Sequence, residues 1–176
     1  MKYVIMTEGT CEKALIDVLI NKDLFKIPVE SLLYEEIFQA RQIKGSLLEK
    51  INQLPYDEKI IIIRVGDKLS DNLAIPEEIQ NKIEKQLKIC IKPEFEILHL
   101  IHKNKANSYI NKYKSGVKPS EFLHNIDCEY EKSYEYNYNY FNSISKSDLK
   151  RIIINYSKIR SKVHKKDEEL LENYIE

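Results

Sequence analysis

The sequence predicts an α/β fold, a mostly parallel sheet flanked by helices, with a helical C-terminal appendage. Strand-like and helical patterns alternate over about the first hundred residues, as they do where helices connect parallel strands. The clearest strand, residues 59–65, contains the consecutive isoleucines Ile60–Ile63, a pattern typical of a strand buried on both faces. Beyond residue 103, apolar residues recur mainly at helical spacing.

We expect a strand at residues 3–7 and then a helix at 10–22, with Thr7 and Thr10 as candidate caps. The pattern continues with a strand at 29–34, a helix at 46–54 and the isoleucine strand. Pro76 favours the start of a helix that runs to about residue 87, because Ile79, Ile83 and Leu87 are in helical phase. A short strand at 88–91 follows it.

The second half is expected to be mainly helical. Helices are predicted after Pro93, through Phe95 to His102, and at residues 148–162, where Ser147 is a candidate cap. The last ten residues, 167–176, read as an acidic helical tail or a frayed end. Residues 1–103 would form the α/β core, and residues 104–176 a helical extension packed on the same domain.

Tyrosines alternate with polar residues from Tyr134 to Tyr140. If this segment were extended, four phenol rings would lie on one face. Such a face can stack unpaired bases, but packing against a domain or a partner subunit is the commoner role of tyrosine.

The net charge excludes no class of function by itself, because the chain has 28 basic and 28 acidic residues. The charges are unevenly distributed, however. Residues 1–100 carry 14 basic and 17 acidic side chains, whereas residues 101–166 carry 14 basic and 6 acidic ones. The cluster from Lys146 to Lys166 could therefore bind phosphates, although a solvated helix face explains it nearly as well.

Three cysteines without a CxxC spacing argue against a disulfide framework and against a thiolate zinc site. No apolar run approaches the roughly 20 residues of a membrane span, so we expect no membrane contact. The stretch between Lys2 and Glu8 is too short for the apolar segment of a signal peptide, and we expect a cytoplasmic location.

Two short runs combine glycine with an acid at the end of a predicted strand: Glu8-Gly9 and Gly66-Asp67. The carboxyl ends of parallel strands meet at one edge of the sheet, where ligands gather in α/β folds. Clustered carboxylates suit Mg²⁺ or Mn²⁺, and such an ion can activate water for attack on a phosphodiester. Each run could also be only a turn.

These residues resemble the Toprim domain of topoisomerases, bacterial primases, small maturation ribonucleases and overcoming-lysogenization-defect nucleases. The resemblance covers about residues 3–92: a strand, Glu8-Gly9-x-x-Glu12 and a helix, then a strand with Asp67. A further run, residues 92–102, is similar to the segment with proline, Phe-Glu and histidine in RloB-like and abortive-infection Toprim proteins.

The resemblance implies roles for particular residues. Glu8 would be a metal ligand or proton-transfer group, and Asp67 a metal ligand. Leu69 stands where the family has the second acid of its Asp-x-Asp pair, so Asp71, or Asp67 alone, would have to serve. Glu96 could complete the carboxylate set, and Lys112 or Lys114 could be the basic residue near the scissile phosphate. Glu12, Glu94, His99 and His102 are further candidates, each with a commoner structural role. Arg151, Lys158 and Arg160 would line a phosphate path together with Lys112 and Lys114.

The predicted function is a Mg²⁺- or Mn²⁺-dependent Toprim-like nuclease that acts on DNA or RNA, in bacterial antiphage defence. A second hypothesis is a catalytically weak Toprim-like subunit that binds and regulates a partner ATPase. The missing second acid motivates it, and the chain has no nucleotide-binding glycine-rich loop of its own. A third possibility, a processing ribonuclease, differs from the first only in its substrate.

Overall fold

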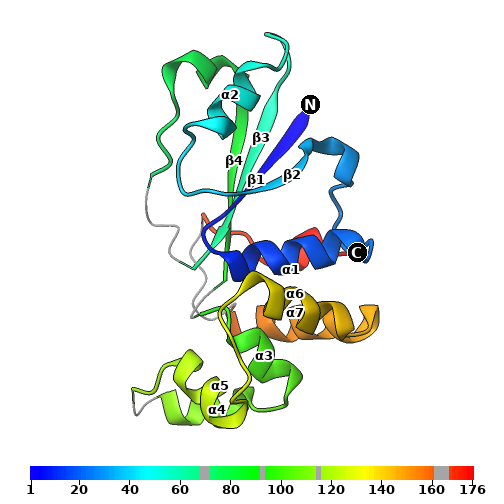
Figure 1. Ribbon diagram of the computed structural model, residues 1–176, viewed down its shortest axis with the longest axis vertical. Helices are drawn as coiled ribbons and strands as arrows, with labels where there is room; N and C mark the ends of the chain where they lie inside the picture. The colour runs from blue at the N-terminus through cyan, green and yellow to red at the C-terminus, as the bar shows by residue number, and fades with distance from the viewer. Residues whose placement is uncertain (68–71, 92–93, 114–115, 161–166) are drawn as a thin grey trace.

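The computed structural model describes residues 1–67, 72–91, 94–113, 116–160 and 167–176. Four strands form one sheet in the order β2-β1-β3-β4, and every pairing between them is parallel (Figure 1). The predicted α/β fold with a parallel sheet is confirmed. This arrangement is consistent with a Toprim-like fold. The strands are β1 (Lys2–Thr7), β2 (Leu32–Gln39), β3 (Ile60–Gly66) and β4 (Ile83–Cys90).

Both faces of the sheet are buried, which explains why β3 begins with four consecutive isoleucines. Ile60 and Ile62 belong to one hydrophobic cluster, which also contains residues of α2 (Ser46–Asn52). Ile63 and Val65 belong to the other cluster, together with residues of α1 (Thr10–Asn21). Successive side chains of a strand point to opposite faces, so a strand between two apolar layers needs apolar residues at both.

The C-terminal half of the chain is helical, as predicted, and it shares the α1 side of the core. Figure 1 shows α6 alongside α1, on the side that faces away from the sheet, with α3, α4 and α5 farther from the sheet. Helix α7 packs on α3. Phe141 and Tyr156 are fully buried in the cluster that also contains Leu15. The helices are α3 (Ile97–His102), α4 (Ala106–Tyr113), α5 (Pro119–Ile126), α6 (Tyr134–Ser143) and α7 (Lys146–Arg160).

The helix expected from Pro76 to residue 87 is wrong. This segment forms a 3-10 turn, η2 (Glu77–Lys82), and then strand β4. Lys82 is buried, and its ammonium donates to the carbonyls of Ile51, Asn52 and Leu54 at 3.1, 3.3 and 2.7 Å. The lysine thus satisfies carbonyls at the C-terminal end of α2, a long-range interaction that sequence periodicity does not reveal.

The second strand also begins later than expected, because residues 29–31 form a 3-10 turn, η1 (Val29–Ser31), before β2. β2 carries an irregularity in its pairing with β1, and Tyr34 and Glu35 within it have positive φ angles of 53° and 55°. An irregular strand at the edge of a sheet is a poor template for pairing with another chain.

The tyrosine-rich segment is helix α6, so the extended strip that the alternation would allow does not form. Ser133 caps this helix by accepting a hydrogen bond from the amide of Tyr136 at 3.1 Å. Rings four residues apart stack, with centroids 5.7 Å apart for Tyr134 and Tyr138. Asn21 of α1 donates to the Tyr138 hydroxyl at 3.0 Å. These tyrosines therefore join α6 to itself and to α1.

Two smaller expectations also differ from the structure. The amide of Asp148 in α7 donates to Ser145 Oγ at 3.1 Å, so Ser145 rather than Ser147 caps this helix. The last residues are not a free tail: η3 (Leu171–Tyr174) buries Leu171 in the core, and Ile175 forms a bridge with Phe25. In the part of the chain that the structure describes, no helix is long and apolar enough to cross a membrane.

Candidate functional site: an acidic pocket at the carboxyl edge of the sheet

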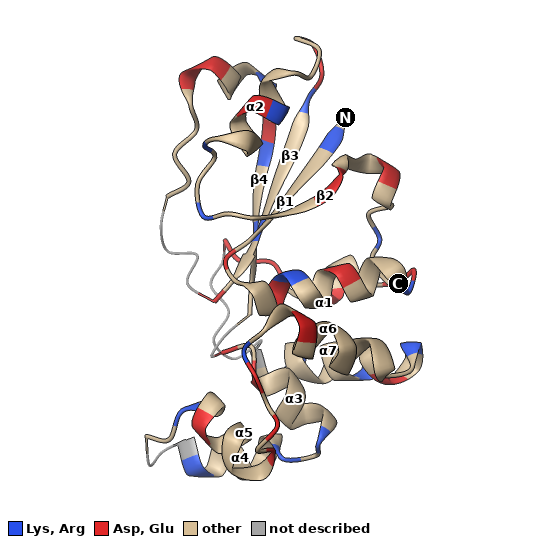
Figure 2. Ribbon diagram, viewed as in Figure 1, with Lys and Arg blue, Asp and Glu red and all other residues tan. Residues whose placement is uncertain are grey.

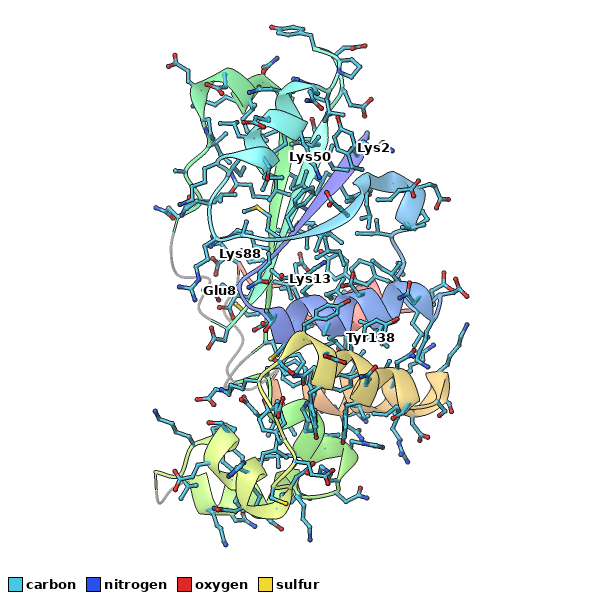
Figure 3. The ribbon with its side chains drawn as sticks, in the orientation of Figure 1. Lys2, Glu8, Lys13, Lys50, Lys88 and Tyr138 are labelled. Carbon is cyan, nitrogen blue, oxygen red and sulfur yellow. The ribbon has the colours of Figure 1, made fainter. Side chains whose placement is uncertain are left out.

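The carboxyl ends of β1 and β3 lie side by side, and a pocket of about 340 Å³ opens there, between the start of α1 and the segment before α3. Figure 3 shows Glu8 at this place, where β1 ends and α1 is about to begin. We call this site the acidic pocket. Its charged lining residues are Glu8, Glu12, Asp67, Glu94, Glu96, Arg41 and Lys132.

Glu8 is fixed by the strand beside it. Its amide donates to the carbonyl of Val65 at 2.9 Å, which extends the β1–β3 pairing by one residue. Its side chain lies over Gly66: a Cβ at Gly66 would stand 2.8 Å from Glu8 Cβ and 3.0 Å from Glu8 Cδ. Gly66 is therefore required for the close approach of Glu8. The Glu8 side chain is 7% exposed, and its Oε1 lies 3.6 Å from Arg41 Nε.

Glu12 lies in the first turn of α1 and is mostly buried. Burial is the main cause that raises the pKa of its carboxyl. Its own backbone amide lowers the pKa, and the negative charges of Asp67, Glu8 and Glu96 raise it further. The negative charges of three other carboxylates thus act on Glu12, and a bound cation would relieve this repulsion.

Glu96 is 2% exposed and carries its own counter-charge. Lys132 Nζ lies 2.6 Å from Glu96 Oε1, and the Tyr130 hydroxyl donates to the same oxygen at 3.0 Å. Burial lowers the pKa of Lys132, but the hydrogen bond and the charge of Glu96 outweigh it, and the pKa is raised overall. Both partners of Glu96 come from the segment that leads into α6.

The backbone around Lys132 is held by a buried amide. Asn137 Nδ2 donates to the carbonyls of Glu131 and Ser133, at 3.2 and 2.7 Å, on either side of Lys132. Asn137 Oδ1 lies 2.8 Å from His99 Nε2. Burial lowers the pKa of His99 to about 4, against the hydrogen bond to Asn137, which raises it. A neutral His99 that donates to Asn137 therefore orients the amide that positions Lys132.

The acidic pocket fits Mg²⁺ or Mn²⁺ in the kind of ligand it offers, because five of its lining side chains are carboxylates. Among the residues that the structure describes, the buried Oε2 atom of Glu94 has no hydrogen-bond partner, and a cation would coordinate it. In that same part of the chain, no three His, Cys, Asp or Glu side chains are arranged to hold an ion as they stand. Arg41 and Lys132 provide positive charge beside Glu8 and Glu96, and a metal ion would compete with them.

The structure brings the predicted residues Glu8, Asp67 and Glu96 to one pocket, together with Glu12 and Glu94. Asp71 and Lys114 lie outside the described residues. His99 and His102 do not line the pocket: His99 is bonded to Asn137, and His102 Nδ1 lies 2.7 Å from the Tyr140 hydroxyl.

The basic residues predicted to contact nucleic acid lie elsewhere, and none of those described lines the acidic pocket. Lys112 Nζ lies 5.6 Å from the centre of the Phe122 ring. Arg151 pairs with Asp148 on α7 at 2.8 Å, and Lys158 lines a different pocket, beside Ile101. Arg160 ends α7, and its side chain lies outside the described part of the structure. Their role in nucleic-acid binding stays a prediction.

Sequence reasoning missed Arg41, Tyr130 and Lys132. Each belongs to a segment without a motif. Arg41 and Lys132 reach the pocket, and Tyr130 reaches Glu96, only through long-range packing. No sequence signal singles out Arg41, because the predicted strand before it ends at residue 34.

Comparisons of the chain with protein-family models, with curated proteins and with solved structures gave no match. The resemblance to Toprim proteins therefore depends on the residues quoted above and stays a prediction.

Proposed function

We propose that this protein is a divalent-metal-dependent, Toprim-like nuclease that hydrolyses nucleic-acid phosphodiesters, and that it acts in bacterial antiphage defence. One observation carries the biochemical part: five carboxylates and two basic side chains line a single pocket at the carboxyl edge of a parallel sheet. The setting in antiphage defence is supported only by the similarity of residues 92–102 to RloB-like and abortive-infection proteins.

Glu8 and Asp67 would hold Mg²⁺ or Mn²⁺, with Glu12, Glu94 and Glu96 as the further oxygen donors of the pocket. A bound ion supplies an activated water and a positive charge against the phosphate. The site's acids are poorly suited to bind a polyanion without it, because five carboxylates line the pocket against two basic side chains.

Lys132 would contribute the positive charge that steadies the phosphate, in the role that the sequence suggested for Lys112 or Lys114. Its ammonium is already at the pocket, and Asn137 fixes the backbone on both sides of it. A positively charged group held in place before the reaction stabilises the developing charge without a cost of reorganisation.

A second candidate is the catalytically weak regulatory subunit of a partner ATPase. Two features favour it: Leu69 replaces the second acid of the Asp-x-Asp pair, and Glu96 is paired with Lys132. On this account the acidic pocket would bind a cation without cleaving nucleic acid.

The test is a cleavage assay of single- and double-stranded DNA and RNA with Mg²⁺ or Mn²⁺. We expect cleavage by the wild type, abolished by Glu8→Gln and by Asp67→Asn, and unchanged by Glu84→Gln on the exposed part of β4. Equal cleavage by wild type and both pocket variants would remove the assignment. Cation binding without cleavage of any substrate would favour the regulatory subunit.

A further inference from the structure

A second pocket, of about 570 Å³, adjoins the acidic pocket, and Arg41 lines both. It lies between the end of β2, the loop that follows and the start of α2. We call it the basic pocket, and the lining residues that matter here are Phe38, Arg41, Gln42, Lys44 and Ser46.

The basic pocket differs from its neighbour in charge. Among the residues that the structure describes, the only charged side chains in its lining are Arg41 and Lys44. Figure 2 shows the corresponding basic positions in blue on the loop between β2 and α2. The two pockets together therefore place carboxylates on one side of Arg41 and positive charge on the other.

The loop that carries these basic residues is anchored. Gln42 Oε1 accepts a hydrogen bond from the amide of Ala74 at 3.0 Å, and Gln42 Nε2 donates to the carbonyl of Asn72 at 3.4 Å. Ile43 is buried in the core cluster beneath α2. Arg41 and Lys44 thus have exposed side chains. Their backbone is held in place by the hydrogen bonds between Gln42 and the segment after β3, and by the buried Ile43.

Arg41 is suited to a phosphate at the junction of the two pockets. Its side chain is 69% exposed, although its Nε lies 3.6 Å from Glu8 Oε1. A guanidinium has five N–H donors in a planar fork, which matches the oxygens of a phosphodiester. Arg41 can therefore approach Glu8 and still present donors to an anion.

We propose that the basic pocket binds the phosphate backbone of a nucleic-acid strand beside the scissile phosphate. This inference rests on the proposed nuclease function and names the surface that holds its substrate. Arg41 would contact the phosphate nearest the acidic pocket and Lys44 the next one along. Without such a surface, the carboxylates of the acidic pocket would repel the strand.

The test is equilibrium binding of a fluorescein-labelled 20-nucleotide single strand, measured by anisotropy in EDTA between 50 and 300 mM NaCl. Three forms are compared: wild type, the double variant Arg41→Ala/Lys44→Ala, and the double variant Arg151→Ala/Lys158→Ala. The second variant removes the same charge from α7, the surface that the sequence had suggested. All targeted side chains in the basic pocket are exposed, and thermal melting checks that each protein is folded.

We expect the basic-pocket variant to bind at least 10-fold more weakly at 100 mM salt. The slope of log K against log salt should fall by about 1.5, since two phosphate contacts are lost. The α7 variant should bind within about 3-fold of the wild type. Wild-type binding by the basic-pocket variant, an equal loss in the α7 variant, or no strand binding by the wild type would each overturn the inference.

The same proteins separate this inference from the proposed function. Glu8→Gln should still bind the strand in EDTA, because Glu8 is no part of the basic pocket. If the wild type cleaves with Mn²⁺ but both double variants bind equally well, only the basic pocket is wrong. If no substrate is cleaved and the basic-pocket variant alone loses binding, the surface stands and the nuclease function falls.

Discussion

Lys132 Nζ lies 2.6 Å from Glu96 Oε1, so a lysine from the segment before α6 neutralises a buried carboxylate from the segment before α3. These residues are 36 positions apart in the chain. The pair closes one side of the acidic pocket, and it places the C-terminal half of the chain in contact with the edge of the sheet where Glu8 and Asp67 lie.

Removing Lys132 should destabilise the metal-free protein and increase its response to a cation. We expect Lys132→Met to cost roughly 1–2 kcal/mol of unfolding free energy. This is less than the 3–5 kcal/mol typical of a fully buried pair, because Lys132 is 58% exposed and solvent screens its charge. Mn²⁺ should then raise the melting temperature more in the variant than in the wild type, because the cation replaces the lost charge.

Thermal melting with and without 1 mM Mn²⁺ measures both effects. The matched control is Lys146→Met, which breaks the exposed pair between Lys146 and Asp23 and should change neither quantity by much. A Lys132→Met variant as stable as the wild type would show that Glu96 does not need this counter-charge.

A methyl group at Gly66 should displace Glu8. Gly66→Ala would put a Cβ 2.8 Å from Glu8 Cβ, closer than real contacts allow. We expect about 1–3 kcal/mol of destabilisation from overpacking and at least a 10-fold loss of Mn²⁺ affinity. Chemical denaturation and calorimetric titration measure the two.

Gly116→Ala is the comparison for this glycine. Gly116 has φ +82° and open space around it, so alanine there should cost about 1 kcal/mol of backbone strain and leave Mn²⁺ affinity unchanged. Equal Mn²⁺ affinity in Gly66→Ala and in the wild type would mean that the position of Glu8 over Gly66 is unimportant for the site.

Stability should fall as the pH is lowered from 6.5 to 4, because of His99. Burial lowers the pKa of His99 to about 4 in the folded protein, against about 6.5 in the unfolded chain. The unfolded chain therefore binds more protons between these values, and unfolding becomes easier as the pH falls. The loss is about 3 kcal/mol at pH 4 and is complete only below that pH, where the folded His99 is protonated as well.

Urea denaturation at several pH values tests this. His99→Gln should reduce the change in unfolding free energy between pH 6.5 and 4. His124→Gln, at an exposed position, should leave this change as in the wild type. An unchanged slope in His99→Gln would show that another group causes the acid sensitivity.

The cysteines should differ sharply in reactivity. Burial raises the pKa of the Cys11 thiol to about 11, and the charges of Glu12 and Glu96 add to this. At pH 8 only about a thousandth of Cys11 is thiolate, the reactive form. Cys90 is buried and Cys128 exposed. A disulfide reagent should thus modify Cys128 in a rapid kinetic phase. Cys128→Ser should remove this rapid phase. A fast phase that persists in Cys128→Ser would contradict the raised pKa of Cys11 or the burial of Cys90.

The parts of the fold that local patterns control could be predicted from the sequence. The run Ile60–Ile63 has no polar position, and only a strand between two apolar layers tolerates that. The segment from Ile79 to Leu87 could not be predicted in this way. Its apolar spacing fits a helix, but the buried ammonium of Lys82 and pairing with β3 favour a strand, and both interactions depend on distant residues.

The candidate site likewise contains residues that the sequence predicts and residues that it does not. Glu8 and Asp67 follow strands, so topology alone brings them to one edge. Lys132 reaches Glu96 only because α6 packs on α1 and Asn137 holds the preceding turn, and Arg41 reaches Glu8 because the loop after β2 is anchored by Gln42. Positive charge at this site therefore depends on tertiary packing, which no short motif records.

The most direct test of the central claim is a calorimetric titration of the purified protein with Mn²⁺. We expect the wild type to bind Mn²⁺, Glu8→Gln and Asp67→Asn to lose at least 10-fold in affinity, and Glu84→Gln to bind as the wild type does. No Mn²⁺ binding by the wild type, or the same affinity in all four proteins, would contradict a metal site in the acidic pocket.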